Sequence, residues 1–154
     1  MRVLGVDVGL RRIGLAVSDD SATLARPWQT IAAESTPVKT AGRIVDLVER
    51  ERRATLDDFA LGAIVVGLPR RLNGSDTDAT AAARALAEAL GARTGLPVVF
   101  QDERLTSREA EAMLAKREPD WRARKKLIDA AAAAIVLQDH LDQGHGDQAG
   151  DVPE

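Results

Sequence analysis

The chain has 154 residues and no cysteine, and its formal net charge is −3 at pH 7. This length favours a single domain, and the absence of cysteine excludes disulfides and thiolate metal sites, as is usual in a reducing cytoplasm. No apolar run is long enough to cross a bilayer, and no signal-peptide pattern starts at Met1. We therefore expect a soluble, cytoplasmic protein with no membrane partner.

The chain opens with two predicted strands that a glycine turn connects. They cover about Arg2–Val8 and Ile13–Ser18, with Gly9 at the turn. Apolar residues alternate along the first strand, which is the period of a half-buried strand. Asp7 interrupts this pattern on the second face. Because an unpaired carboxylate is costly to bury beside a sheet core, Asp7 requires a structural or a chemical reason.

Strands and helices alternate along the rest of the chain. A cap residue followed by proline predicts a helix that begins at Pro37. The other expected elements are a strand at Trp28–Ile31, a buried strand at Leu61–Leu68, a helix at Ala79–Leu90 capped by Asp78, a strand at Pro97–Gln101, a helix from Thr106 to about Glu118 and a last helix at Trp121–Leu141. This order predicts an α/β fold in which a mixed sheet carries helices on both faces.

The last residues differ in charge from the rest of the chain. Residues 142–154 hold four acidic residues and no Lys or Arg, so residues 1–141 carry a net charge of +1. Together with three glycines, this composition predicts a disordered acidic tail after a single domain that spans residues 1–141. The nearly neutral domain has basic clusters, which permit contacts with phosphates but do not require them.

Three acidic residues stand where a purely structural role does not explain them. Asp7 lies within the first strand, Glu103 lies just after the strand at Pro97–Gln101, and Asp129 lies beside the apolar stripe of the last helix. Neighbouring carboxylates repel one another and resist ionising, and a divalent cation removes that cost. Oxygen ligands favour Mg²⁺ or Mn²⁺. Two such ions can activate a water and stabilise the leaving oxygen of a phosphodiester.

Each acid also has a plain structural interpretation. Asp7 could be a hydrogen-bonded turn residue, Glu103 a solvated loop residue, and Asp129 the partner of Lys125 in an i,i+4 ion pair. Only the joint arrangement favours a catalytic metal site. In that case we expect phosphate contacts from four basic residues: Arg11, Arg12, Arg104 and Lys126.

At four places the sequence resembles the YqgF family, also called RuvX. The matching motifs are Asp7-Val8-Gly9 with Arg12, Gly14 and Ala16; Gly67-Leu68-Pro69 before Gly74-Ser75; the run from Asp102 to Ser107; and Lys126 with Asp129 and the alanine-rich helix after it. The resemblance extends in order from about Arg2 to Leu141. It implies a ribonuclease H-like fold with Asp7, Glu103 and Asp129 as metal-binding catalytic acids. Family members are associated with maturing the 5′ end of the small-subunit (pre-16S) ribosomal RNA precursor, and relatives of the fold resolve Holliday junctions. Leu10 stands where members often carry a small hydroxyl residue.

Four functional interpretations follow. The leading one is a metal-dependent nuclease that acts on structured RNA, the ribosomal precursor above all, as a monomer or a homodimer. A Holliday junction resolvase acting on branched DNA would need two active sites and hence a symmetric dimer. An actin-like ATPase would share the strand with Asp-x-Gly, but its site lies between two domains and this length supplies about one. The fourth is a non-catalytic nucleic-acid-binding module, against which the presence of all three acids weighs.

Overall fold

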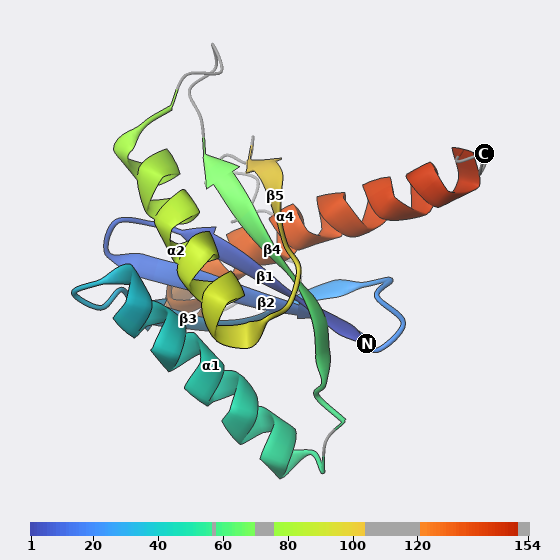
Figure 1. Cartoon of the computed structure of the whole chain (residues 1–154), viewed down its shortest axis with the longest axis horizontal. Helices are drawn as coiled ribbons and strands as arrows, with labels where there is room; N and C mark the ends of the chain where they lie inside the picture. Colours follow the sequence, from blue (N-terminus) through green and yellow to red (C-terminus); the bar gives the residue numbers. More distant parts are fainter. Residues whose placement is uncertain (57, 70–75, 104–120, 151–154) are drawn as a thin grey trace.

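The fold was described from a computed structural model that covers residues 1–56, 58–69, 76–103 and 121–150, without the side chains of 121–127 and 145–150. One mixed sheet contains five strands in the order β3 (Ala25–Ala32), β2 (Arg12–Ser18), β1 (Arg2–Val8), β4 (Leu61–Pro69) and β5 (Val98–Glu103). Helices α1 (Pro37–Ala54) and α2 (Asp78–Thr94) cover one face, and α4 (Trp121–Gly150) crosses the other (Figure 1). The predicted α/β fold with helices on both faces is confirmed.

The central strand β1 decides which way Asp7 points. It runs antiparallel to β2 and parallel to β4. Its residues Leu4, Val6 and Val8 are buried in the core that α1 and α2 form with the sheet. Since side chains alternate between the two faces of a strand, Asp7 faces α4. The hairpin closes where the Gly9 N–H donates to the Arg12 carbonyl oxygen at 2.9 Å.

Small residues let α4 approach the sheet closely. The second core packs alanines and larger apolar residues of α4 against the strands; its buried members are Ala16, Ala25, Val65, Ala133, Ala134, Val136, Leu137 and Leu141. A Cβ atom at Gly14 would lie 1.9 Å from the backbone carbonyl oxygen of Asp129, and one at Gly5 would lie 2.8 Å from the Cβ of Leu137. Neither distance is possible between real atoms, so glycine at these two strand positions sets the separation of helix and sheet.

Most expected boundaries agree with the structure to within two residues. Thr36 caps α1, because its Oγ1 accepts from the Lys39 N–H at 3.1 Å, and Pro37 follows it as predicted. Strand β3 is longer than expected because Pro27 lies in an edge strand, where its missing N–H is tolerated. The expected helix from Thr106 to Glu118 lies outside the described residues.

Three helix ends differ from the prediction. Helix α2 ends at Thr94 and not at Leu90, because Gly95 is the glycine that adopts the left-handed conformation at its C-cap. Thr77, not Asp78, caps α2: its Oγ1 accepts from the Thr80 N–H, and the Thr80 hydroxyl accepts from the Thr77 N–H at 2.9 Å. This reciprocal pair satisfies two backbone groups that a lone aspartate would not. At the other end of the chain, α4 continues from Leu141 to Gly150. Glycine lowers helix propensity by about 1 kcal/mol relative to alanine but keeps its N–H, so it does not end a helix by itself.

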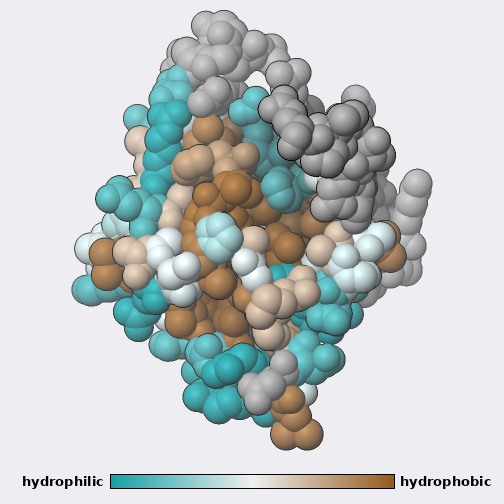
Figure 2. Space-filling view, turned by 45° about the vertical axis from the view of Figure 1, so that its right-hand side comes forward, coloured by the Kyte–Doolittle hydropathy of each residue, from teal (hydrophilic) through white to brown (hydrophobic). Residues whose placement is uncertain are grey.

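One face of the molecule carries a local apolar area. Figure 2 shows apolar residues gathered in the middle of one face, with hydrophilic residues on either side. Edge strand β5 exposes Val99 and Phe100. Isolated exposed apolar side chains are common in soluble domains, so these alone do not indicate a site. Among the helices of the described ranges, none has the length and apolar composition needed to cross a membrane.

The contact at Gly14 gives the first testable prediction. Gly14→Ala should lower the free energy of unfolding by at least about 2 kcal/mol, because the new methyl group meets helix backbone that cannot move aside without lifting α4. Gly91→Ala in α2 is the matched control, since its Cβ would meet only a Val98 methyl at 3.5 Å. We expect that variant to be as stable as the parent or up to about 1 kcal/mol more stable. Urea unfolding measures both, and equal stability of the two variants would refute the close approach.

Candidate functional site

The fold brings the three predicted acids to one face of the sheet. Asp7 pairs in register with Gly14, and the α4 backbone crosses Gly14 at Asp129. On the other side of β1, a Cβ at Gly67 would lie 3.2 Å from Glu103 Oε2. The two glycines that flank Asp7 therefore leave room for a helix on one side and for a second carboxyl group on the other.

Glu103 is the last residue of β5 and was expected just after that strand. It stands in register with Pro69 at the end of β4. Its Oε2 atom is buried and has no hydrogen-bond partner among the described residues. A buried carboxyl oxygen without a donor is an unsatisfied acceptor, which native proteins avoid unless another group completes it. The expectation of a solvated loop residue is therefore wrong for Glu103.

Asp7 and Glu103 form a coupled pair. Burial raises the pKa of Asp7; a hydrogen bond with the Glu103 side chain opposes this shift, and the negative charge of Asp129 adds to it. Burial, the charge of Asp7 and their shared hydrogen bond raise the pKa of Glu103 from 4.5 to about 9. Without a counter-charge, one proton therefore stays on this pair at neutral pH.

Asp129 has a different partner. The Arg12 Nε lies 3.0 Å from its Oδ2 in an ion pair, and the side chains of Arg12 and Asp129 are 61% and 29% exposed, respectively. The sequence suggested an ion pair with Lys125, whose side chain lies outside the described residues, and gave Arg12 a phosphate-binding role only. The partnership of Arg12 and Asp129 joins two segments far apart in the chain, and no spacing rule in the sequence indicates it.

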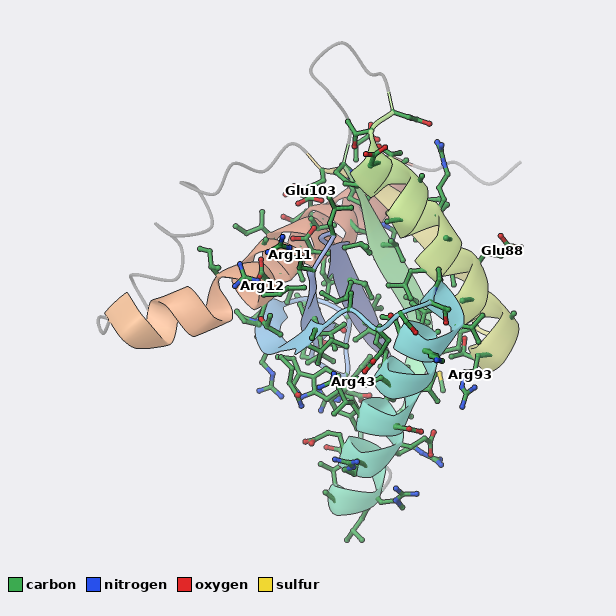
Figure 3. All side chains as sticks on the ribbon, turned by 90° about the vertical axis from the view of Figure 1, so that its left-hand side faces the viewer. Arg11, Arg12, Arg43, Glu88, Arg93 and Glu103 are labelled. Atoms are coloured by element: carbon green, nitrogen blue, oxygen red, sulfur yellow. The ribbon has the colours of Figure 1, made fainter. Side chains whose placement is uncertain are left out.

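The basic residues of the hairpin lie beside the acids. Figure 3 shows Arg11 and Arg12 next to α4, at the end of the sheet that carries Glu103, whereas Arg43 and Arg93 lie on the helices of the opposite face. The side chains of Arg104 and Lys126, the other two expected phosphate contacts, lie outside the described residues. The structure thus brings together Asp7, Glu103, Asp129, Arg11 and Arg12, and these are the residues on which the site can be argued.

The donor set fits a divalent cation. All candidate ligands are carboxylate oxygens, which hard cations such as Mg²⁺ and Mn²⁺ prefer. The unsatisfied Glu103 Oε2 and the raised pKa values of the acid pair indicate a place that lacks positive charge. Within the described ranges, no three acidic or histidine side chains already have metal-ligand spacing. Asp7 and Glu103 are adjacent, and Asp129 is turned toward Arg12.

Comparison with known proteins identifies the fold and the protein family of this chain. The sheet with its helices is similar to the Thermus thermophilus RuvC structure, with a TM-score of 0.52 and 18% identity over 95% of this chain and 97% of that one. This likeness shows the fold, which is ribonuclease H-like. A sequence profile described as RuvX, Holliday junction resolvase, matches residues 1–143, and the chain belongs to this family.

Curated relatives extend the match over nearly the whole chain. One from Anaeromyxobacter sp. is 41% identical over 94% of this chain and 99% of its own length. Another from Pelotomaculum thermopropionicum is 38% identical over 92% of this chain and 87% of its own length. Both carry the name "Putative pre-16S rRNA nuclease". The resemblance seen in the motifs is confirmed, and the chain is a nuclease; neither the ATPase interpretation nor the non-catalytic one is favoured.

The acid pair predicts how stability depends on pH. A carboxyl group with a raised pKa holds its proton more tightly in the folded state. The protonated Glu103 therefore stabilises the fold fully below pH 4.5, the pKa of the group in the unfolded chain. This stabilisation is lost as the pH rises through about 9, its pKa in the folded protein. Glu103→Gln cannot ionise, so its stability should change less over this range and should exceed the parent's at alkaline pH by on the order of a few kcal/mol.

Urea midpoints measured without divalent cations from about pH 5 to about pH 9 test this expectation. Glu88→Gln on α2 is the control, because Glu88 is exposed and lies away from the acids (Figure 3). Parallel pH profiles of the parent and Glu103→Gln would show that Glu103 has no raised pKa.

Proposed function

We propose that the chain is a divalent-metal-dependent phosphodiester hydrolase and that its physiological reaction is maturation of the 5′ end of the pre-16S ribosomal RNA. The observation that carries the proposal is the partly buried Asp7–Glu103 pair at the strand ends, with the Glu103 Oε2 atom buried and Asp129 across Gly14 from the pair. The names of the curated relatives support the substrate. A cytoplasmic location accords with such a substrate, and residues 1–141 would form the catalytic domain.

The three acids would hold the cation, with Mg²⁺ or Mn²⁺ as the ion that suits their oxygens. When bound, the cation supplies the positive charge that activates a water and stabilises the leaving oxygen. Asp7 fixes the position of the site, because β1 is paired on both sides. The acid pair would lose the proton that it holds in the cation-free protein, since a nearby dication would oppose the cause of the raised pKa of Glu103. The exposed Arg11 is available to orient a phosphate of the nucleic acid.

Resolution of Holliday junctions is the second candidate. The description of the family and the fold shared with the Thermus thermophilus RuvC structure favour it. A junction has two strands to cut, so this activity requires two copies of the site in a symmetric dimer. The mass of the protein in solution, with and without a synthetic four-way junction, separates this candidate from a monomeric RNA nuclease.

The direct test is a cleavage assay that compares precursor ribosomal RNA with a four-way junction. Asp7→Asn should reduce cleavage of the true substrate by at least about 100-fold, as is typical when a group that stabilises the transition state is removed. Chelation with EDTA should abolish cleavage. Asp46→Asn is the control for the change in net charge, because Asp46 is an exposed residue of α1 on the opposite face of the sheet.

The melting temperature of Asp7→Asn separates chemistry from folding. Because burial raises the pKa of Asp7 and Asp129 repels it, its neutral replacement should leave the cation-free protein at least as stable as the parent. Full cleavage by Asp7→Asn, or cleavage that continues in EDTA, would refute the proposed mechanism. A lower melting temperature would indicate a structural role for Asp7.

A further inference from the structure

The ion pair between Arg12 and Asp129 lies at the border of the candidate site. Arg12 opens β2 directly after the hairpin turn, and its Nε is 3.0 Å from Asp129 Oδ2. The guanidinium remains mostly exposed, and the carboxylate is partly exposed. An exposed pair of this kind contributes little to stability, about 0–1 kcal/mol. The apolar contacts of α4 already hold this helix to the sheet. The ion pair therefore needs another explanation.

Arg12 is paired with Asp129, the carboxylate that Asp7 and Glu103 would need as a third metal ligand. Asp129 is close enough to raise the pKa of Asp7 by its charge. Yet within the part of the chain that the structure describes, no three potential ligands have the spacing for a metal ion. No N–H or hydroxyl group of the described residues donates a hydrogen bond to Glu103 Oε2, and the Glu103 carboxyl group has only the Asp7 carboxyl group beside it. The carboxylate that would complete the set is bound to a guanidinium.

We propose that Arg12 and a divalent cation compete for the Asp129 carboxylate, so that Arg12 is a positioning residue that links cation entry to phosphate binding. This inference rests on the proposed function and concerns the regulation of the same site. A dication attracts a carboxylate more strongly than a single guanidinium charge does. As the cation takes Asp129, the guanidinium of Arg12 is released close to the acids, where its planar set of N–H donors suits a phosphate of the incoming nucleic acid.

The exchange makes the two ligands cooperative. A phosphate that binds Arg12 removes the competitor for Asp129, which strengthens cation binding. By thermodynamic reciprocity, the cation strengthens binding of the nucleic acid by the same factor. Without nucleic acid, Arg12 keeps Asp129 neutralised and lowers the affinity for free cation. A nuclease with this arrangement binds its metal tightly only on its substrate.

Arg11 provides a matched control in the same turn. It is an exposed arginine beside α4 (Figure 3), and it has no ion pair with any residue in the described ranges. Replacing either arginine by glutamine changes the net charge near the acids equally. Only the replacement of Arg12 frees Asp129. A difference between the two variants therefore measures the competition and not the general change in electrostatic potential.

The first experiment measures Mn²⁺ affinity of the full chain without nucleic acid, from the electron paramagnetic resonance signal of the free ion. Arg12→Gln should bind Mn²⁺ at least about five-fold more tightly than the parent, the lower end of typical coupling between linked sites. Arg11→Gln should change the affinity much less. Arg12→Lys keeps the charge and should stay near the parent. A merely structural ion pair predicts the opposite sign, because its loss would displace Asp129 and weaken Mn²⁺ binding.

The second experiment measures the affinity for a fluorescein-labelled four-way junction by anisotropy, in EDTA and in Ca²⁺. Replacing EDTA by Ca²⁺ should increase the affinity for the junction in the parent and in Arg11→Gln. The increase should be smaller in Arg12→Gln. Equal Mn²⁺ affinity of the two glutamine variants, or weaker Mn²⁺ binding by Arg12→Gln than by the parent, would overturn the inference. Retained cleavage by Asp7→Asn would instead refute the nuclease site itself, so the two failures are distinguishable.

Discussion

The close approach of α4 to the sheet is the constraint on which the candidate site depends. The carbonyl oxygen of Asp129 occupies the space that a side chain at Gly14 would fill. Since Gly14 is the register partner of Asp7, the same contact carries Asp129 to the acid of the central strand. A helix held farther away would still cover the apolar residues of the sheet, but its carboxylate would no longer act on Asp7.

That contact also creates an electrostatic problem. Asp7 and Glu103 lie side by side and partly buried, and neither has an ion pair among the described residues, because Arg12 is engaged with Asp129. Stability alone would not favour such an arrangement, because buried carboxylates without a counter-charge weaken a fold. The apolar cores on the two faces of the sheet supply the stability that this arrangement requires. The cost is consistent with the proposed function, in which these acids bind a divalent cation.

Local patterns in the sequence predicted the strands and helices well where the signal was itself local. The β1–β2 hairpin followed from alternation and a glycine, the buried β4 from its continuous apolar run, and the start of α1 from a threonine before a proline. The cap of α2 was wrong because Thr77 and Thr80 satisfy each other, which a search for a single acidic cap overlooks. The end of α4 was wrong because glycine was given too much weight as a helix terminator.

The candidate site was predictable in its acids but not in their pairing. Asp7 stood out as a charge within an apolar strand, Asp129 as a charge beside the apolar stripe of a helix, and Glu103 as an acid near a strand end. Their distances depend on strand order and on the seating of α4, which periodicity does not encode. The contact of Arg12 with Asp129 and the space that Gly14 and Gly67 leave around Asp7 are tertiary facts. For Arg104 and Lys126, phosphate contact stays a prediction.

The order of the strands also distributes mobility among the three acids. Asp7 belongs to a strand with neighbours on both sides, whereas Glu103 ends an edge strand and Asp129 sits on a helix packed from one side. Backbone paired on both sides opens least often in native-state fluctuations. Asp7 therefore serves as the fixed reference of the site, and any adjustment to a cation of different radius falls to Glu103 and Asp129. In the proposed metal site, discrimination between ions would then reside in the two outer acids, and the central acid would set where any of the ions binds.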